Sequence, residues 1–136
     1  MYQHKLQLRV RYSDTDQMGY VYYGNYASYY EAARVEALRA LGLTYRALEE
    51  SGIMMPVLEN YSKYIAPAHY DELLTITTTV KEKPGVRIMF EYEIFNENND
   101  MIHIGHTKLV FVNMVTKRPC AMPENMEQLL SSYFSV

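Results

Sequence analysis

The sequence predicts an α+β fold, in which a five-stranded antiparallel sheet wraps around one long helix. Three observations support this class: an alternating apolar pattern at the start of the chain, a long segment of helical periodicity after it, and a remainder rich in β-branched and aromatic residues. A long helix inserted after the first strand of an otherwise antiparallel sheet is typical of α+β proteins.

The first strand and the helices follow from local patterns. Apolar and polar residues alternate from Leu6 to Tyr12, which is the signature of a half-buried strand. From about Asn25 to Leu41 the apolar residues recur three or four positions apart, and Gly42 follows as a helix end. A shorter helix is expected from Thr44, as its N-cap, to about Glu50.

Four further strands are expected after Ile53, where β-branched and aromatic residues dominate. One runs from Leu74 to Val80 and the next from Val86 to Ile94, with a tight connection at residues 83–85 between them. Residues 96–100 then predict a second hairpin turn.

The last strand is expected at about Ile102 to Val115. From Leu109 to Val112 consecutive residues are apolar, and consecutive residues of a strand point to opposite faces. Both faces of the strand should therefore be covered there. A second subunit is one candidate for that cover. The segment from Pro123 to Phe134 predicts a short terminal helix.

Composition favours a cytoplasmic protein of one domain spanning residues 1–136. No apolar run approaches the roughly 18 residues of a membrane helix, and the first residues lack the apolar core of a signal peptide. The only cysteine, Cys120, cannot form an internal disulfide. The net charge is −3, and the lysines and arginines are scattered, which argues against nucleic acid as a partner.

The candidate site lies between Ser13 and Arg34. Two carboxylates, Asp14 and Asp16, precede a turn rich in glycine and tyrosine that runs directly into the long helix. A helix start offers unpaired N–H groups and a partial positive charge, so an acid just upstream can face a site that attracts developing negative charge. A carboxylate next to unpaired N–H groups is a combination that suits an acyl-transfer site.

The motifs around this turn point to one family. They are Tyr12-Ser-Asp-Thr-Asp16, Gly19-Tyr-Val-Tyr-Tyr23, Asn25-Tyr26 and Glu31-Ala-Ala-Arg34, with Tyr64-Ile-Ala-Pro-Ala-His-Tyr-Asp71 further on. Together with the order of elements, they resemble the 4-hydroxybenzoyl-CoA thioesterase family of hot-dog-fold proteins, including its YbgC-like acyl-CoA thioesterases. The resemblance covers nearly the whole chain. It implies hydrolysis of a coenzyme A thioester without a metal or redox cofactor, in at least a homodimer and often a tetramer.

The resemblance also implies site residues. The second aspartate of the pair, Asp16, is the expected catalytic carboxylate, and the backbone N–H of Tyr23 is the expected oxyanion donor. Substrate contacts are expected at Gly19, Tyr22 and Asn25. YbgC-like members often carry histidine where this chain has Tyr23, while the 4-hydroxybenzoyl-CoA thioesterase branch has tyrosine. The resemblance therefore does not specify the acyl group of the substrate. Whether Asp16 attacks the carbonyl or activates a water also stays open.

Structural interpretations accompany these assignments. Asp14 is expected to bond its own backbone, and Gly19 can be explained by turn geometry alone. Core or subunit-interface packing is the interpretation for four tyrosines, Tyr22, Tyr26, Tyr29 and Tyr30. His69, His103 and His106 match no metal-ligand spacing and are interpreted as ordinary strand or surface residues. Glu31 and Arg34, three residues apart on the helix, are expected to pair with each other or with neighbouring chains.

Two other functions remain as alternatives. A non-catalytic module that binds acyl-CoA or acyl carrier protein would leave Asp16 as a turn residue. A hot-dog dehydratase or hydratase would need a histidine paired with an acid. No histidine lies between Lys5 and Pro67, which argues against that reading. An acyl carrier protein could also replace coenzyme A as the thioester donor.

Overall fold

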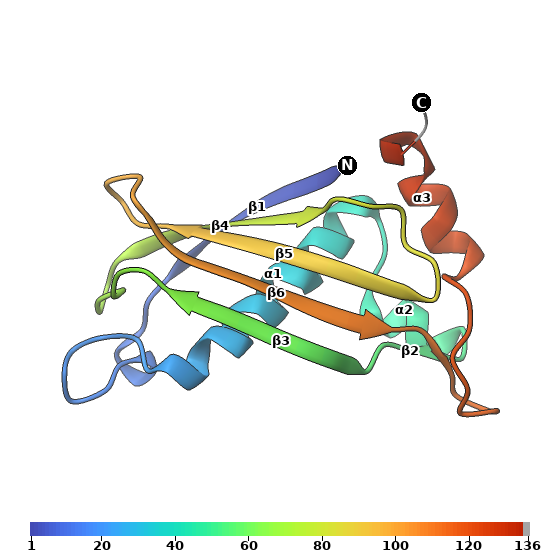
Figure 1. Cartoon of the computed structure of the whole chain (residues 1–136), viewed down its shortest axis with the longest axis horizontal. Coiled ribbons are helices and arrows are strands. Elements are labelled where there is room, and N and C mark those ends of the chain that lie inside the picture. The colour runs from blue at the N-terminus through green and yellow to red at the C-terminus, as the bar shows by residue number, and fades with distance from the viewer. Residues whose placement is uncertain (135–136) are drawn as a thin grey trace.

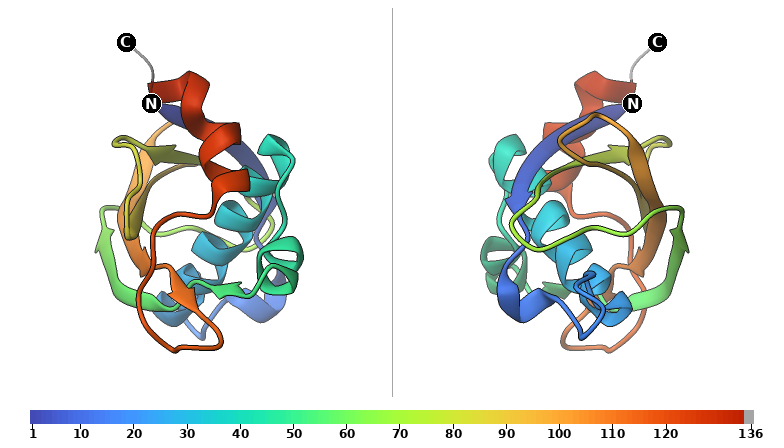
Figure 2. Two further views of the ribbon diagram at one scale, coloured as in Figure 1. Left: turned by 90° about the vertical axis from the view of Figure 1, so that its right-hand side faces the viewer. Right: turned by 90° about the vertical axis from the view of Figure 1, so that its left-hand side faces the viewer.

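The computed structural model describes residues 1–134 and has a five-stranded antiparallel sheet that curls around one long helix (Figures 1 and 2). This arrangement confirms the predicted fold class. The strand order is β1-β4-β5-β6-β3, which leaves β1 and β3 at the two edges. The five strands are β1 (Tyr2–Arg9), β3 (Val57–Tyr64), β4 (Leu73–Val80), β5 (Arg87–Phe95) and β6 (Met101–Val110).

The helices form where the local patterns predict them. Gly42 ends the long helix in a left-handed conformation with φ of 96°, which glycine adopts at little cost. Thr44 caps the next helix, because its hydroxyl accepts the Ala47 N–H at 3.0 Å. The helices are α1 (Tyr26–Leu41), α2 (Tyr45–Glu50) and α3 (Glu124–Phe134), with short 3₁₀ turns η1 (Tyr12–Asp14) and η2 (Tyr23–Asn25). None of the helices within residues 1–134 is long and apolar enough to cross a membrane.

The core lies between α1 and the concave face of the sheet (Figure 2). Ala33 and Ala37 of α1 are completely buried, and their small side chains let the helix approach the strands closely. Each fully buried large apolar side chain contributes roughly 1.5–3 kcal/mol. The largest ones facing this interior include Tyr30, Leu74, Ile76, Phe90, Tyr92 and Ile94.

Two of the predicted strand ends were wrong. The alternation at the N-terminus stops at the buried Val10, and Tyr12 lies in η1 with 78% of its surface exposed. The last strand ends at Val110, and the chain then forms β7 (Val112–Asn113), which pairs with β2 (Ile53–Met54) in a separate ribbon. Breaking the strand lets the chain leave the main sheet and turn toward α3 (Figure 1).

The apolar run from Leu109 to Val112 is covered by this chain itself. All four residues are at most 8% exposed, and Phe111 belongs to the same core cluster as Met126 and Leu130 of α3. This run therefore gives no reason to invoke a second subunit.

Candidate active site

The loop between β1 and α1 forms a small ribbon at the end of the molecule where α1 begins (Figure 1). Within it Thr15 pairs with Val21, and the Asp16 N–H donates to the Tyr20 carbonyl at 2.9 Å. On the other side Tyr20 pairs with His69, which follows β3 in the chain. The ribbon thus joins segments that are far apart in the sequence.

Asp16 stands on the turn at the tip of this ribbon. Its side chain is exposed, and one carboxylate oxygen accepts the Met18 N–H at 2.9 Å. The Gly19 N–H closes the turn by donating to the Asp16 carbonyl at 3.0 Å. Gly19 has φ of 80°, so the turn conformation alone accounts for a glycine there. A carboxylate so placed is open to a substrate or a water molecule.

Asp14 has a different environment and is only 6% exposed. One carboxylate oxygen accepts the Arg11 N–H at 3.0 Å and the Tyr29 hydroxyl at 2.9 Å. Burial raises the pKa of Asp14, but the hydrogen bonds from Arg11 and Tyr29 and the Arg11 guanidinium outweigh it, so the pKa lies below its ordinary value. Asp14 therefore holds η1 in place, in agreement with its predicted bonding to nearby backbone.

Tyr23 is the first residue of η2, which leads directly into α1. The Tyr22 N–H donates to the Asp14 carbonyl at 2.9 Å, and the Asn25 N–H to the Tyr22 carbonyl at 2.9 Å. Within residues 1–134 the Tyr23 N–H has no such partner. This free donor lies at the positive end of a helix and can donate a hydrogen bond to an anionic oxygen. The Tyr64 hydroxyl also donates to the Tyr23 carbonyl at 3.4 Å. This hydrogen bond connects the backbone of Tyr23 to the end of β3.

A cavity of about 250 Å³ lies between this loop, the first residue of α1 and the end of β3. Three tyrosines, Tyr20, Tyr26 and Tyr64, form its walls, and Val21 and residues 65–67 complete it. Behind the walls lies His103, which is fully buried and stacks on Tyr26 with ring centroids 4.1 Å apart. Burial lowers the pKa of His103 to about 4, so its ring is neutral at physiological pH. Sequence reasoning missed Tyr64 and His103 at this position, because only the folded sheet brings β3 and β6 next to the loop.

The expected substrate contacts all lie on this loop, but Asn25 already has a structural partner. Its side-chain N–H donates to the Asp14 carbonyl at 2.7 Å. Tyr22 is 44% exposed, and its ring contacts that of Tyr23 with centroids 4.5 Å apart. Tyr22 is therefore free to meet a ligand, whereas the amide nitrogen of Asn25 fixes the loop.

Three further tyrosines of this stretch and Arg34 belong to the interior. Tyr26, Tyr29 and Tyr30 are at most 3% exposed, as their predicted core role requires. Arg34 does not form the expected ion pair with Glu31. Its guanidinium instead donates to three hydroxyl groups at 3.0 to 3.2 Å, those of Tyr45, Tyr92 and Thr107.

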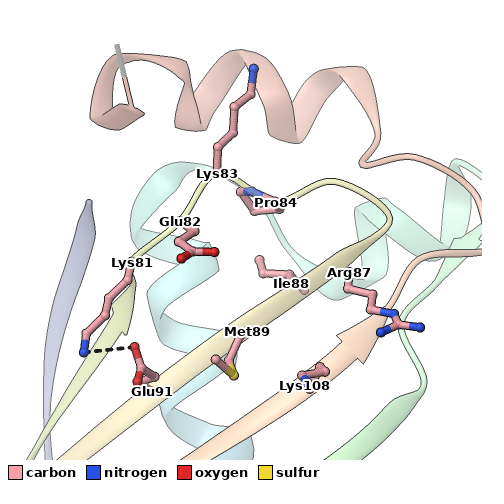
Figure 3. A pocket seen from close by; sticks show the side chains of 9 residues that line it. All are labelled: Lys81, Glu82, Lys83, Pro84, Arg87, Ile88, Met89, Glu91 and Lys108. Atoms are coloured by element: carbon pink, nitrogen blue, oxygen red, sulfur yellow. Dashed lines mark ion pairs between the residues drawn. The ribbon is translucent and has the colours of Figure 1, made fainter. Parts of the chain in front are cut away.

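A cavity of about 460 Å³, larger than the one beside the loop, lies elsewhere, along the β4–β5 hairpin (Figure 3). This hairpin is at the end of the sheet opposite to the start of α1 (Figure 1). Three lysines of this cavity, Lys81, Lys83 and Lys108, each pair with a glutamate at 3.1 to 3.4 Å. Their charges are therefore largely neutralised. Within residues 1–134, no group of three or more histidine, cysteine or carboxylate side chains could hold a metal ion.

A sheet curled around a central helix, with a carboxylate turn at the start of that helix, defines the chain as a hot-dog-fold protein. Residues 10–130 match the model of the thioesterase-like superfamily. An acyl-CoA thioesterase YbgC of Haemophilus influenzae is 34% identical over 121 residues, 88% of each chain. An acyl-CoA thioester hydrolase YbgC of Escherichia coli O6:H1 is 32% identical over 119 residues, 88% of this chain and 89% of the relative.

The solved structures agree with these relatives. A DHNA-CoA thioesterase from Staphylococcus aureus superposes with a TM-score of 0.87 at 30% identity, over 100% of this chain and 97% of the other. The chain therefore belongs to the thioesterase-like superfamily, and it is a thioester hydrolase.

Proposed function

We propose that this protein hydrolyses an acyl-CoA thioester to a free acid and coenzyme A, with Asp16 as its catalytic carboxylate and the Tyr23 N–H as its oxyanion donor. The relatives named as acyl-CoA thioester hydrolases support the coenzyme A thioester as substrate. An acyl carrier protein as thioester donor differs only in what carries the same pantetheine arm, so the reacting atoms would meet the same residues.

The observation that carries this proposal is the contrast between bonded and free groups around the turn. Asp14 is buried and bonded, while Asp16 is exposed. The N–H groups of Tyr22 and Asn25 are used within the loop, while the described residues leave that of Tyr23 free. Thioester hydrolysis needs a nucleophile or base on one side of the carbonyl and a donor for the developing oxyanion on the other. In this proposal Asp16 is the nucleophile or base, and the Tyr23 N–H is the donor for the oxyanion.

The acyl group, in this proposal, occupies the cavity walled by Tyr20, Tyr26 and Tyr64. Its volume of about 250 Å³ is enough for an aromatic ring or a medium-length chain. The aromatic thioester named for the Staphylococcus aureus structure favours an aromatic acyl group here. Gly19, Tyr22 and Asn25 would then lie along the approach to the reacting carbonyl.

We also infer a homo-oligomer of at least two subunits. The edge strand β3 leaves one side of its backbone without a strand partner in the five-stranded sheet. It exposes about half of the side chains of Val57, Leu58 and Tyr64. Unprotected apolar edge strands promote association. Leu58→Lys should therefore shift the mass measured by light scattering toward the monomer, and an unchanged mass would place the interface elsewhere.

Release of free thiol from benzoyl-, acetyl-, hexanoyl- and palmitoyl-CoA tests the activity, with wild type and Asp16→Asn compared. The variant keeps the size of the side chain and the acceptor for Met18, but loses the charge. We expect turnover by the wild type, loss of at least about 100-fold in the variant, and the same melting temperature. Full activity in the variant would remove Asp16 from the mechanism. Tight binding of these thioesters without turnover by wild type would favour the binding module.

The oxyanion donor can be tested by removing a backbone N–H. Proline is tolerated at the first position of a helical turn, and the preceding Tyr22 has φ of −60° and ψ of 133°, a conformation that precedes proline readily. Tyr23→Pro should therefore fold and lose about 100- to 1,000-fold in kcat. Tyr23→Ala is the matched control, because it loses the same ring but keeps the N–H. Equal activity in both variants would exclude this N–H as the donor.

A further inference from the structure

Beyond the proposed residues, His69 lies beside the candidate site. Tyr20 separates it from Asp16, because the Asp16 N–H donates to the Tyr20 carbonyl and Tyr20 pairs with His69 on its other side. The rings of Tyr20 and His69 meet edge to face with centroids 5.2 Å apart. Since neighbouring strands lie ~4.8 Å apart, the backbones of Asp16 and His69 are about 10 Å apart. Two side chains with a substrate carbonyl and a water molecule between them can span that distance.

Glu72 orients the imidazole. One of its carboxylate oxygens accepts the backbone N–H of His69 at 2.7 Å and lies 2.9 Å from Nδ1 of the ring. The Val10 N–H, which donates to the Glu72 carbonyl at 2.9 Å, holds this turn against the end of β1. A carboxylate beside Nδ1 favours the tautomer with its proton on that atom, which leaves the lone pair on Nε2. His69 is 54% exposed at its side chain, and the described residues provide no partner for Nε2.

The chemistry of the proposed function gives such a base a task. If a carboxylate oxygen of Asp16 attacks the thioester carbonyl, the C–S bond breaks and the thiolate of coenzyme A leaves. The acyl group is then joined to Asp16 as a mixed anhydride. In this state Asp16 has no free carboxylate and cannot take the proton of the water that must attack next. A second base is needed for that step.

We propose that His69, held by Glu72, is this second base, an inference that rests on the proposed function of Asp16. Nε2 takes a proton from water as its oxygen attacks the acyl carbon of the anhydride. The bond between that carbon and the Asp16 oxygen breaks, which releases the acid and restores the carboxylate. The imidazolium then returns its proton to the thiolate, directly or through solvent, so one water is added overall to the thioester.

The test compares the burst of free thiol with steady-state turnover in rapid mixing experiments, using whichever of benzoyl-CoA and hexanoyl-CoA the wild type hydrolyses faster. His69→Gln should release about one thiol per site in a burst and then turn over at least about 100-fold more slowly. Hydroxylamine should trap the accumulated acyl group as its hydroxamate. Glu72→Gln keeps an acceptor for Nδ1 without the charge and should show the same burst with a smaller loss of turnover.

His106→Gln is the matched control, because His106 also pairs with a glutamate, Glu59, at 3.7 Å, but in the sheet between β6 and β3. It should behave as wild type. Turnover of His69→Gln within twofold of wild type would overturn the inference, as would loss of the burst together with turnover. Neither result would remove Asp16 from catalysis. Full activity of Asp16→Asn would instead overturn the proposed function.

Discussion

Replacing the buried aspartate of the pair should cost stability, whereas replacing the exposed one should cost activity. Asp14→Ala removes the acceptor of two donors, the Arg11 N–H and the Tyr29 hydroxyl. Hydrogen bonds to a charged group contribute about 1.5–3 kcal/mol each. The ion pair with Arg11 adds little, because the Arg11 side chain is 76% exposed. Since water can satisfy part of the vacated site, we expect a loss of about 3 kcal/mol in the free energy of unfolding.

For a chain of this length, about 3 kcal/mol corresponds to a fall of roughly 10 °C in melting temperature. Circular dichroism melts of both alanine variants at one protein concentration measure it, and Asp16→Ala should stay within about 3 °C of wild type. The pH dependence provides a second check. The pKa of Asp14 is lowered on folding, so its contribution is complete above the unfolded pKa near 3.9 and disappears as the pH falls through the folded value. An unchanged melting temperature for Asp14→Ala, with activity lost, would reverse the roles of the two aspartates.

Two further predictions concern the interior behind the site. A side chain on Gly105 would place its Cβ 1.9 Å from the Tyr30 hydroxyl and 2.7 Å from the Tyr61 carbonyl, so Gly105→Ala should destabilise the fold by about 1–3 kcal/mol in urea unfolding. Gly85→Ala, where the Cβ meets nothing within 4 Å, should be nearly neutral, and equal effects of the two would contradict the packing described. His103 has its pKa lowered to about 4 from 6.5, so the unfolded chain binds more protons between these values and stability should fall by up to about 3 kcal/mol as the pH drops through them. His103→Gln should flatten this slope in denaturant titrations from pH 7 to 4, and a slope like that of wild type would show that other groups produce it.

The elements that local chemistry specifies were predicted well. A glycine after the last helical turn and a threonine before the next helix act within a few residues, so Gly42 and Thr44 could be read from the sequence. The end of the last strand could not be predicted from the sequence in this way. Apolar residues at both odd and even positions indicate that both faces of the strand are covered, but not what covers them. Here all four residues of the run are buried within this chain itself, without a second subunit. That outcome depends on contacts between segments far apart in the chain.

The same limit explains how much of the site was predictable. Asp16 and Tyr23 lie within one continuous segment that begins at the turn and ends in a helix, so a motif can identify them. His69 is brought to the site by its cross-strand pair with Tyr20, and no local sequence pattern predicts that pair. The absence of histidine between Lys5 and Pro67 was therefore a weak argument against a histidine and acid pair near the helix start, because the fold brings His69 and Glu72 there from beyond that interval. What disfavours a dehydratase or hydratase is instead the family to which the chain belongs. In our proposal, a histidine that Tyr20 separates from the carboxylate acts within thioester hydrolysis itself, where an anhydride on Asp16 would need a second base.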